Sequence, residues 1–452
     1  MAQATIHSSL QVGISNRQIL NIAIPISFGI LVPQLNFITN NIFLGRLNEQ
    51  ALATAAITGV YYLIFAAIGF GLNNGLQALI SRRAGENRPG EIGKLFIHGV
   101  GLSMGIAVVG IVLTYTLSPW VLKFSIHDAI LREQAVSFLK IRIWGLPFLY
   151  VYQMRNALLV GTNQSRYLVA GTIAEALSNI FFDYSFIFGH FGFPALGFNG
   201  AAIASIIAEF MGMSVVFAVI HFKGIGKRFS LFSSFQYDSK SANSILKQSS
   251  PLIFQHAISI LSWEFFYILI EHHGERDLSV SNTMRNIFGL FGMFSWALAA
   301  TCSSMVSNIM GQGLQDRVLE LIFKVVKIST GIALFVFVLL NIFPQAFLSV
   351  YGQNNDWVVH AIPVVRIVSS ALVFMSFSVV CVSAVTGTGN TRVSLLIEFI
   401  TIVMYCVYIW WVLEHLNLSI VVGWMSEWIY WGSMFTLSFL YLRSGKWKGK
   451  VI

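Results

Sequence analysis

Long apolar runs alternate with short polar connections along the whole chain. A helix needs about 20 mostly apolar residues to cross the hydrocarbon core of a bilayer. The pattern predicts about twelve membrane-spanning helices, at roughly 19–44, 52–80, 95–118, 136–160, 167–190, 198–222, 250–272, 279–307, 320–343, 359–386, 393–413 and 418–442. Residues 1–18 are polar and the run that follows is long, so we expect a first membrane helix and no cleaved signal peptide.

Basic residues gather in the connections that follow the even-numbered predicted helices. The opposite connections carry fewer of them. Because cytoplasmic connections are enriched in Lys and Arg, both termini are expected to be cytoplasmic. We expect a multi-pass protein of the bacterial cytoplasmic (inner) membrane. The polar, basic segment 223–249 is the predicted cytoplasmic linker between an N-terminal lobe, 1–222, and a C-terminal lobe, 250–452.

Composition narrows the classes of protein further. Hydrophobic residues make up 56% of the chain and charged residues 10%, against about 25% charged in soluble domains. The net charge of +9 is spread over connections between apolar runs, so we expect the lipid bilayer and no nucleic acid as a partner. The three cysteines lie inside apolar runs, and no catalytic or metal-binding spacing is present. We therefore expect neither an enzyme nor a metal site, and no cofactor.

An internal repeat divides the chain. Pro251 lies 226 positions after Pro25, and the endings ISRRAG and VSNIMG of predicted helices two and eight keep the same offset, as do GTNQSR and GTGNTR. Since six helices per copy is an even number, the copies share one orientation. This predicts an all-α integral membrane protein with twelve transmembrane helices in two six-helix lobes, related by a pseudo-twofold axis along the membrane normal.

Two such lobes with a path between them suit a secondary transporter better than a channel or receptor. A non-transporting membrane sensor or scaffold is the alternative from another class. The absence of any sizeable soluble domain in the sequence argues against it.

Polar residues inside predicted membrane helices are candidates for function, because ionisable groups are costly there. Predicted helix five carries Glu175, Asn179 and Asp183 at a spacing of four, which places them on one stripe. Helix six adds Ser205 and Glu209 at the same spacing. This oxygen-rich set is our candidate for binding the coupling ion, either a proton or a hard cation such as Na⁺.

Helix one contributes amides without any acid. We assign Asn40 to the coupling set, and Gln34 and Asn36 to substrate binding.

Predicted helix seven carries Glu264 between aromatic residues, including Trp263 and Tyr267. An acid among aromatic rings suits an amphipathic cation through charge and cation–π attraction. We therefore predict that these three residues, with Arg285, contribute to substrate binding. The alternative is an ion pair between Glu264 and Arg285.

Glu398 and Glu427 are weaker candidates in the second half, with Arg155 and Arg285 as candidate partners.

Several segments resemble the multidrug and toxic compound extrusion (MATE) family in order along nearly the whole chain. They are NFITNNIFLGRLNEQALATAAI, GFGLNNGLQALISRRAGEN, RIWGLPF, NALLVGTNQSR, SNIFFDYSFIFG, FPALGFNGAAIAS and VTGTGNTR. The resemblance implies twelve helices in two lobes around a central cavity. It also implies export of organic cations and other amphipathic compounds, driven by inward H⁺ or Na⁺.

The resemblance also assigns residues to a cation-responsive cluster. Asn179 and Asp183 match the family's helix-five pair, and Ser205 stands where the family often has Thr. Asn40 replaces the helix-one acid, which weakens the case for Na⁺, and Glu175 is the candidate replacement.

The second half departs from the family's coupling patterns. In helix seven, Glu264 matches the second acid of E-W-W-x-x-E, and Ser259 stands at the first; the helix-ten acid of one bacterial branch falls near Met375.

We therefore expect an antiporter that exports amphipathic, mostly cationic, drugs or metabolites in exchange for H⁺, less favourably Na⁺, by alternating access of two lobes. We expect it to act as a monomer. The alternative is a flippase for a lipid-linked or anionic lipid substrate. Such a protein usually lines its cavity with several Arg or Lys, whereas the deep residues here are mainly acids.

Overall fold

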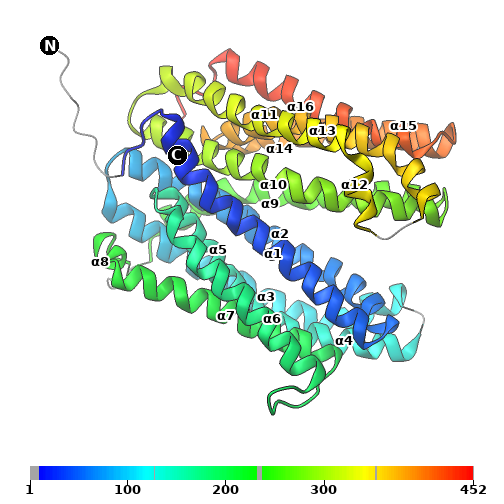
Figure 1. Cartoon of the computed structure of the whole chain (residues 1–452). Coiled ribbons are helices and arrows are strands. Elements are labelled where there is room, and N and C mark those ends of the chain that lie inside the picture. Colours follow the sequence, from blue (N-terminus) through cyan, green and yellow to red (C-terminus); the bar gives the residue numbers. More distant parts are fainter. Residues whose placement is uncertain (1–9, 127, 232–236, 352–353, 451) are drawn as a thin grey trace. The chain divides into compact units, whose positions relative to one another are not determined.

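The computed structural model describes residues 10–126, 128–231, 237–351, 354–450 and 452. These residues form helices joined by short connections and contain no strand. The helices are α1 Asn16–Leu47, α2 Glu49–Gly85, α3 Pro89–Ser125, α4 Ala129–Arg142, α5 Leu146–Gly161, α6 Leu168–Phe188, α7 Phe198–Phe222, α8 Ile225–Arg228, α9 Ser239–Glu271, α10 Glu275–Gly311, α11 Val318–Ile342, α12 Pro344–Ser349, α13 Asn355–Gly387, α14 Thr391–Ile409, α15 Ile420–Trp424 and α16 Ser426–Ser444 (Figure 1).

Each of the twelve predicted spans corresponds to one helix or to a helix with a local break. The fourth span is α4 and α5 joined by the 3₁₀ turn Ile143–Gly145, and the eleventh is α14 with the π-helical end Trp410–His415. Among the described residues, eight helices are by themselves long and apolar enough to cross a membrane. The other four spans are α1, α4–α5, α6 and α15–α16. The part Asn16–Val32 of α1 is apolar by itself, and the fourth and twelfth spans contain breaks.

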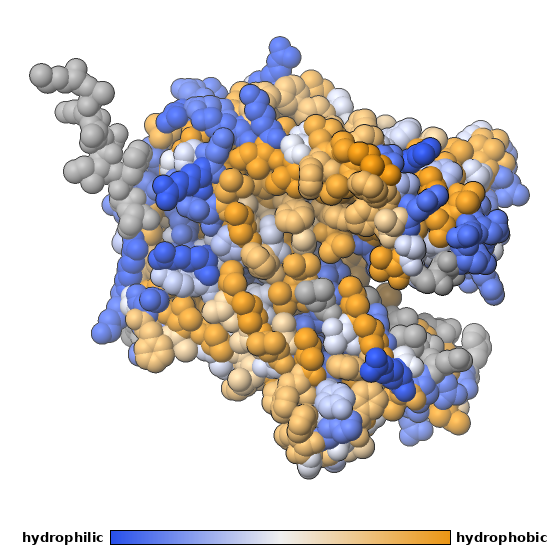
Figure 2. All heavy atoms as spheres, viewed as in Figure 1, coloured by the Kyte–Doolittle hydropathy of each residue, from blue (hydrophilic) through white to orange (hydrophobic). Residues whose placement is uncertain are grey.

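The outer faces of the helices suit a hydrocarbon solvent. Val108, Val109 and Val112 of α3 are each more than half exposed. Figure 2 shows hydrophobic residues over the middle of the helices and hydrophilic residues toward their ends. In water such a surface would drive aggregation, whereas in lipid it is the ordinary outer surface of a bundle.

The helices form two compact units. The N-terminal unit is Phe28–Ile253, and the C-terminal unit is Phe254–Ile452 together with the first 27 residues of the chain. The divisions fall inside α1 and inside α9, and Ile253 lies 226 positions after Ser27, the offset of the sequence repeat. The repeated segments thus divide at equivalent positions.

Specific contacts explain why the start of the chain belongs to the C-terminal unit. The Asn308 side chain accepts from the amide N of Val12 at 3.1 Å and donates to the carbonyl of Leu10 at 2.9 Å. Gln312 donates to the carbonyl of Val12 at 3.0 Å. Leu10, Val12 and Asn308 are almost fully buried, so side chains at the end of α10 hold the non-helical segment that precedes α1.

Glycines set the close approach of helices within the N-terminal unit. A Cβ atom at Gly171 of α6 would collide with Val216 of α7, and one at Gly212 of α7 would lie 2.9 Å from the Cβ of Glu175. Small residues at membrane helix interfaces let backbones approach closely. The α6–α7 pair is thereby fixed in register, and this pair carries most of the predicted coupling residues.

Candidate functional site in the N-terminal unit

A small apolar cluster fixes the register of three helices in the N-terminal unit. Leu44 of α1, Ile187 of α6 and Ala201 of α7 are buried together. The Phe43 ring lies 6.3 Å from Tyr184 and 6.0 Å from Phe188. α1 and α6 run in the same direction, and α7 returns antiparallel to α6 after a short connection (Figure 1).

This register brings three predicted coupling residues to the same height along the helix axes, which we call a level. Asn40 and Asp183 each lie one helical turn before the apolar cluster, and Ser205 lies one turn after it on the antiparallel helix. Asp183 is fully buried, and neither of its carboxylate oxygens has a hydrogen-bond partner among the described residues. The side-chain oxygen of Asn40 is likewise buried and without a partner there. The level is therefore oxygen-rich and holds an uncompensated carboxyl group.

One turn deeper, Asn36, Asn179 and Glu209 share the next level. The side-chain oxygens of both asparagines are buried without partners among the described residues. Glu209 instead forms a two-pronged ion pair with Arg142, with N–O distances of 2.5 and 3.0 Å. The Arg142 guanidinium also lies 3.9 Å from the centre of the Tyr62 ring. Glu209 is thus a buried acid with its own counter-ion, unlike Asp183.

Glu175 occupies the third level, beside Gly212. Arg155 is fully buried nearby and donates to the carbonyls of Met213 at 2.5 Å and Gly212 at 3.4 Å. Its Nε and Nη2 atoms are buried without hydrogen-bond partners among the described residues. The charges of Glu209, Arg155 and Arg142 all act on Glu175.

The charges of the three levels do not cancel when every group is ionised. Asp183, Glu175 and Glu209 contribute three negative charges, and Arg142 and Arg155 contribute two positive ones. One negative charge remains, and Asp183 is the carboxyl with no hydrogen-bond donor among the described residues. The site can therefore reach neutrality by taking up one proton or one monovalent cation.

The residues predicted for substrate binding divide between the units. Gln34, which is exposed, and Asn36 belong to the N-terminal unit. The residues predicted from helices seven and eight belong to the C-terminal unit; they are Trp263, Glu264, Tyr267 and Arg285.

Arg285 lies over aromatic rings in the C-terminal unit. Its guanidinium carbon is 5.5 Å from the ring centres of both Trp263 and Tyr267. Among the described ion pairs, none joins it to Glu264, which is half-buried. The alternative of a Glu264–Arg285 ion pair is therefore absent from the described ion pairs, and Arg285 lies over the two rings instead.

Sequence reasoning missed Arg142 and Tyr62, which define the environment of Glu209. Arg142 lies inside the predicted span 136–160. The criterion applied to acids, that an ionisable residue within a span is functional by default, would have identified it.

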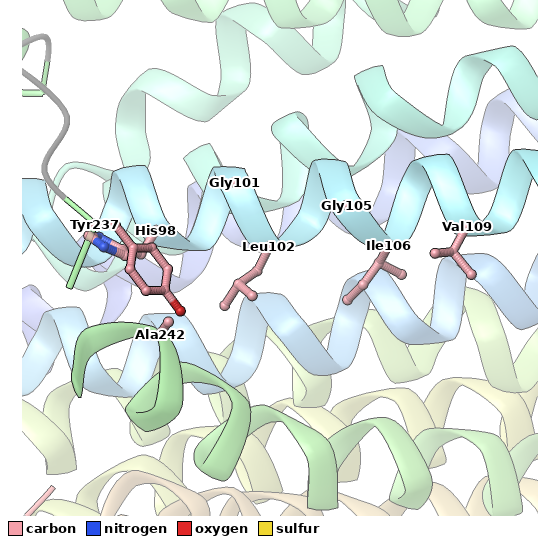
Figure 3. A pocket seen from close by; sticks show the side chains of 8 residues that line it. All are labelled: His98, Gly101, Leu102, Gly105, Ile106, Val109, Tyr237 and Ala242. Carbon is pink, nitrogen blue, oxygen red and sulfur yellow. The ribbon is translucent and has the colours of Figure 1, made fainter. Parts of the chain in front are cut away.

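A groove of about 500 Å³ runs along the outer face of α3 in the same unit (Figure 3). Leu102, Ile106 and Val109 line it, with His98 and Tyr237 at one end. Among the residues that line it there is none of the predicted coupling or substrate residues.

Comparison with known proteins identifies the family. The family model described as MatE matches residues 25–185 and 251–411. The two matches are offset by 226 residues at both ends, which confirms the repeat predicted from the sequence. They cover most of the chain.

Curated relatives agree along the whole length. A probable multidrug resistance protein NorM of Thermotoga maritima is 22% identical over 439 residues, covering 96% of this chain and 94% of that protein. The uncharacterized transporter YisQ of Bacillus subtilis is 22% identical, covering 78% of this chain and 77% of that protein.

Solved structures share the fold. A structure described as MATE in complex with MaL6 aligns with a TM-score of 0.89 and 18% identity, covering 96% of this chain and 97% of that one. A MOP superfamily transporter from Pyrococcus furiosus aligns with a TM-score of 0.86 and 17% identity, covering 98% of both chains. This chain, an all-helical multi-pass membrane protein with two six-helix lobes, belongs to the MatE family.

Proposed function

We propose that the protein is a proton-driven antiporter of the cytoplasmic membrane, with both termini cytoplasmic, that exports small amphipathic compounds, mainly cations. Asp183 would carry the proton. The observation behind this proposal is the fully buried Asp183 carboxyl, which forms no ion pair and has no hydrogen-bond donor among the described residues. A lone carboxylate in a membrane interior is costly. The free energy of the site therefore changes strongly when the carboxyl takes up a proton, and again when it releases that proton into an opened cavity.

The oxygen ligands that the levels offer favour a proton over Na⁺ as the coupling ion. A hard cation needs several oxygen ligands to replace its water shell. Glu209 is paired with Arg142, and the charge of Arg142 also acts on Glu175 and Asp183. The helix-one position holds the neutral Asn40, so the levels carry little excess negative charge for a cation. A proton requires only the free Asp183 carboxyl, which supports H⁺ as the coupling ion.

The proposed substrates follow from the C-terminal unit and from the relatives. Glu264 is a half-buried acid within three residues of both Trp263 and Tyr267 on α9, whose rings lie 6.0 Å apart, and an acid near aromatic rings suits an amphipathic cation. The names of several relatives, such as NorM and MdtK, describe multidrug resistance proteins. We extend that activity to this chain as a proposal, with Gln34 and Asn36 as further contacts from α1.

The energetics are sufficient for a multidrug exporter. Exchange of one H⁺ for one monovalent cation moves no net charge, so the pH gradient supplies the work: about 1.4 kcal/mol per pH unit, enough for a roughly tenfold concentration ratio. In the proposed cycle, protonated Asp183 and bound substrate occur in opposite orientations of the two units, so the proton gradient drives export.

Efflux from proteoliposomes tests the proposal. Purified protein is reconstituted with ethidium as the cationic probe, and a pH gradient or a Na⁺ gradient is imposed separately. We expect the wild type to accumulate ethidium with the pH gradient alone, and Asp183→Asn to reduce accumulation to background. Glu133→Gln, a neutralised exposed acid, is the matched control and should transport normally.

Two outcomes would contradict the proposal. Transport by Asp183→Asn at the wild-type rate would exclude Asp183 as the proton carrier. Transport driven only by Na⁺, or only of an anionic lipid probe, would show that the coupling ion or the substrate class is wrong.

A further inference from the structure

The C-terminal unit contains a second buried carboxyl without a counter-ion. Glu398 lies in the middle of α14 and is 3% exposed. The Tyr430 hydroxyl of α16 donates to its Oε1 atom, and the Gln255 amide of α9 donates to its Oε2 atom at 3.2 Å. The Ser259 hydroxyl of α9 lies 3.5 Å from the Tyr430 hydroxyl. Three helices therefore meet at one carboxyl group.

No basic side chain compensates this carboxyl. Glu398 takes part in none of the ion pairs of the described residues, and its hydrogen-bond partners are neutral side chains. Arg155 and Arg285, the sequence-based candidates for this role, contact other groups. Hydrogen bonds from Tyr430, Gln255 and Ser259 favour the anion, whereas burial in a membrane interior disfavours it. Opposed effects of this kind let a group exchange a proton instead of staying in one state.

The Gln255 side chain can serve both protonation states. Its Nε2 atom donates to Glu398, while its Oε1 atom is buried and has no partner among the described residues. A protonated carboxyl carries an O–H donor. Rotation of the Gln255 amide by half a turn would present Oε1 to that donor, so the buried oxygen gains the partner that it lacks in the present arrangement.

The site lies on the helices that repeat those of the first site. Subtracting 226 from Gln255, Glu398 and Tyr430 gives positions 29, 172 and 204. These fall in α1, α6 and α7, the helices that carry Asn40, Asp183 and Ser205. The side chains are not equivalent, because position 172 is a threonine and Asp183 lies eleven residues further along α6. The same three-helix junction therefore holds an acid in each unit, at different depths.

We propose that Glu398, with Gln255 and Tyr430, forms a second proton-binding site, so that the transport cycle exchanges two protons. Proton uptake reverses the direction of the hydrogen bond between Glu398 and Gln255. Gln255 lies two residues after Ile253, the last residue of the N-terminal unit. The binding site itself is independent of the proposed function, and only the count of two protons per cycle depends on it.

Infrared difference spectroscopy of the purified protein tests the binding site directly, because protonated and ionised carboxyls absorb at different frequencies. During a pH titration we expect Glu398→Gln and Asp183→Asn each to lose one titrating carboxyl band, and the double variant to lose both. Glu427→Gln is the matched control. Glu427 is a buried acid of the same unit that accepts a 2.8 Å hydrogen bond from the Trp431 indole, a group that only donates, and its replacement should leave both bands.

A functional measurement tests the proton count. With the membrane potential clamped at zero, each exchanged proton multiplies the substrate ratio by about ten per pH unit. Glu398→Gln keeps the shape of the side chain. At a pH difference of one unit, we expect its steady-state ethidium ratio to be about tenfold lower than that of the wild type. A melting curve like that of the wild type shows that this variant is folded.

If Glu398→Gln keeps every titrating carboxyl band of the wild type, the proposed site is wrong. If its substrate ratio equals that of the wild type, the count of two protons is wrong. If wild-type protein shows no transport driven by pH while the Glu398 band still titrates, the proposed function fails and the binding site stands.

Discussion

Asp183 and Glu209 are buried acids of one site, yet their partners separate their roles. Glu209 shares two short contacts with Arg142, and both side chains are about nine-tenths buried. Asp183 has no such partner among the described residues. A paired carboxylate holds its charge and its position, whereas an unpaired one is free to exchange a proton. The difference comes from a single arginine on another helix.

The Arg142–Glu209 pair predicts a stability effect. Arg142→Met leaves the Glu209 carboxylate buried and unpaired, which costs about 3–5 kcal/mol when one partner of a buried pair is removed. The double variant Arg142→Met/Glu209→Met removes both charges and should recover most of the lost stability. Melting temperatures of the detergent-solubilised proteins, with and without lipid, measure the effect. Equal melting temperatures for Arg142→Met and the wild type would contradict it.

At the scale of helices, one proline explains the position of Arg142. Pro147 has no amide hydrogen, and its ring clashes with the carbonyl four residues earlier, that of Ile143. The helix therefore tightens into the 3₁₀ turn Ile143–Gly145, and the amide of Leu146 satisfies the Ile143 carbonyl. Gly145 lies against the ion pair, because a Cβ atom there would collide with both Arg142 and Glu209. The break therefore directs the Arg142 side chain, at the end of α4, toward Glu209 of α7.

The α6–α7 contact predicts a difference between glycines. Gly171→Leu inserts a side chain where even a Cβ atom would strike Val216, and overpacking costs about 1–3 kcal/mol. Gly101→Leu on the outer face of α3 is the control, since a Cβ atom there meets no described atom within 4 Å. We expect reduced melting temperature and reduced transport for Gly171→Leu alone. Equal losses in both variants would contradict the prediction, because Leu raises helix propensity at both positions and only Gly171 lacks room for the side chain.

At the scale of the whole molecule, the repeat extends to the segments that precede α1 and α9. The Lys324 side chain of α11 donates to the carbonyl of Ile14 at 3.2 Å. At the position 226 residues earlier, the His98 ring of α3 accepts from the amide of Asp238 at 2.7 Å. The two copies thus fix the entry to their first helices through the same position, although one uses an ammonium group and the other an imidazole.

The same scale gives a prediction about topology. In a background without Cys302, Cys381 and Cys406, we introduce Lys446→Cys near the C-terminus or Glu133→Cys in α4, both exposed positions. If the basic connections are cytoplasmic, a membrane-impermeant maleimide should label Glu133→Cys in intact cells. It should label Lys446→Cys only after permeabilisation. The reverse labelling pattern would place both termini outside.

The sequence by itself determined the properties that depend on one helix at a time. Span length and hydropathy gave the twelve helices, because crossing a bilayer is a local requirement. Helical periodicity gave the stripe of Glu175, Asn179 and Asp183, and the constant offset of 226 gave the repeat.

Only the tertiary structure decided which stripes meet. The register of α1 against α6 depends on packing around Leu44 and Ile187, residues far apart in the chain, and no periodicity within either helix encodes it. That register places Asn40 level with Asp183. Contacts between distant helices likewise gave Glu209 a counter-ion and left Glu398 with neutral partners, because the free energy of a buried charge depends on the neighbours that folding brings to it.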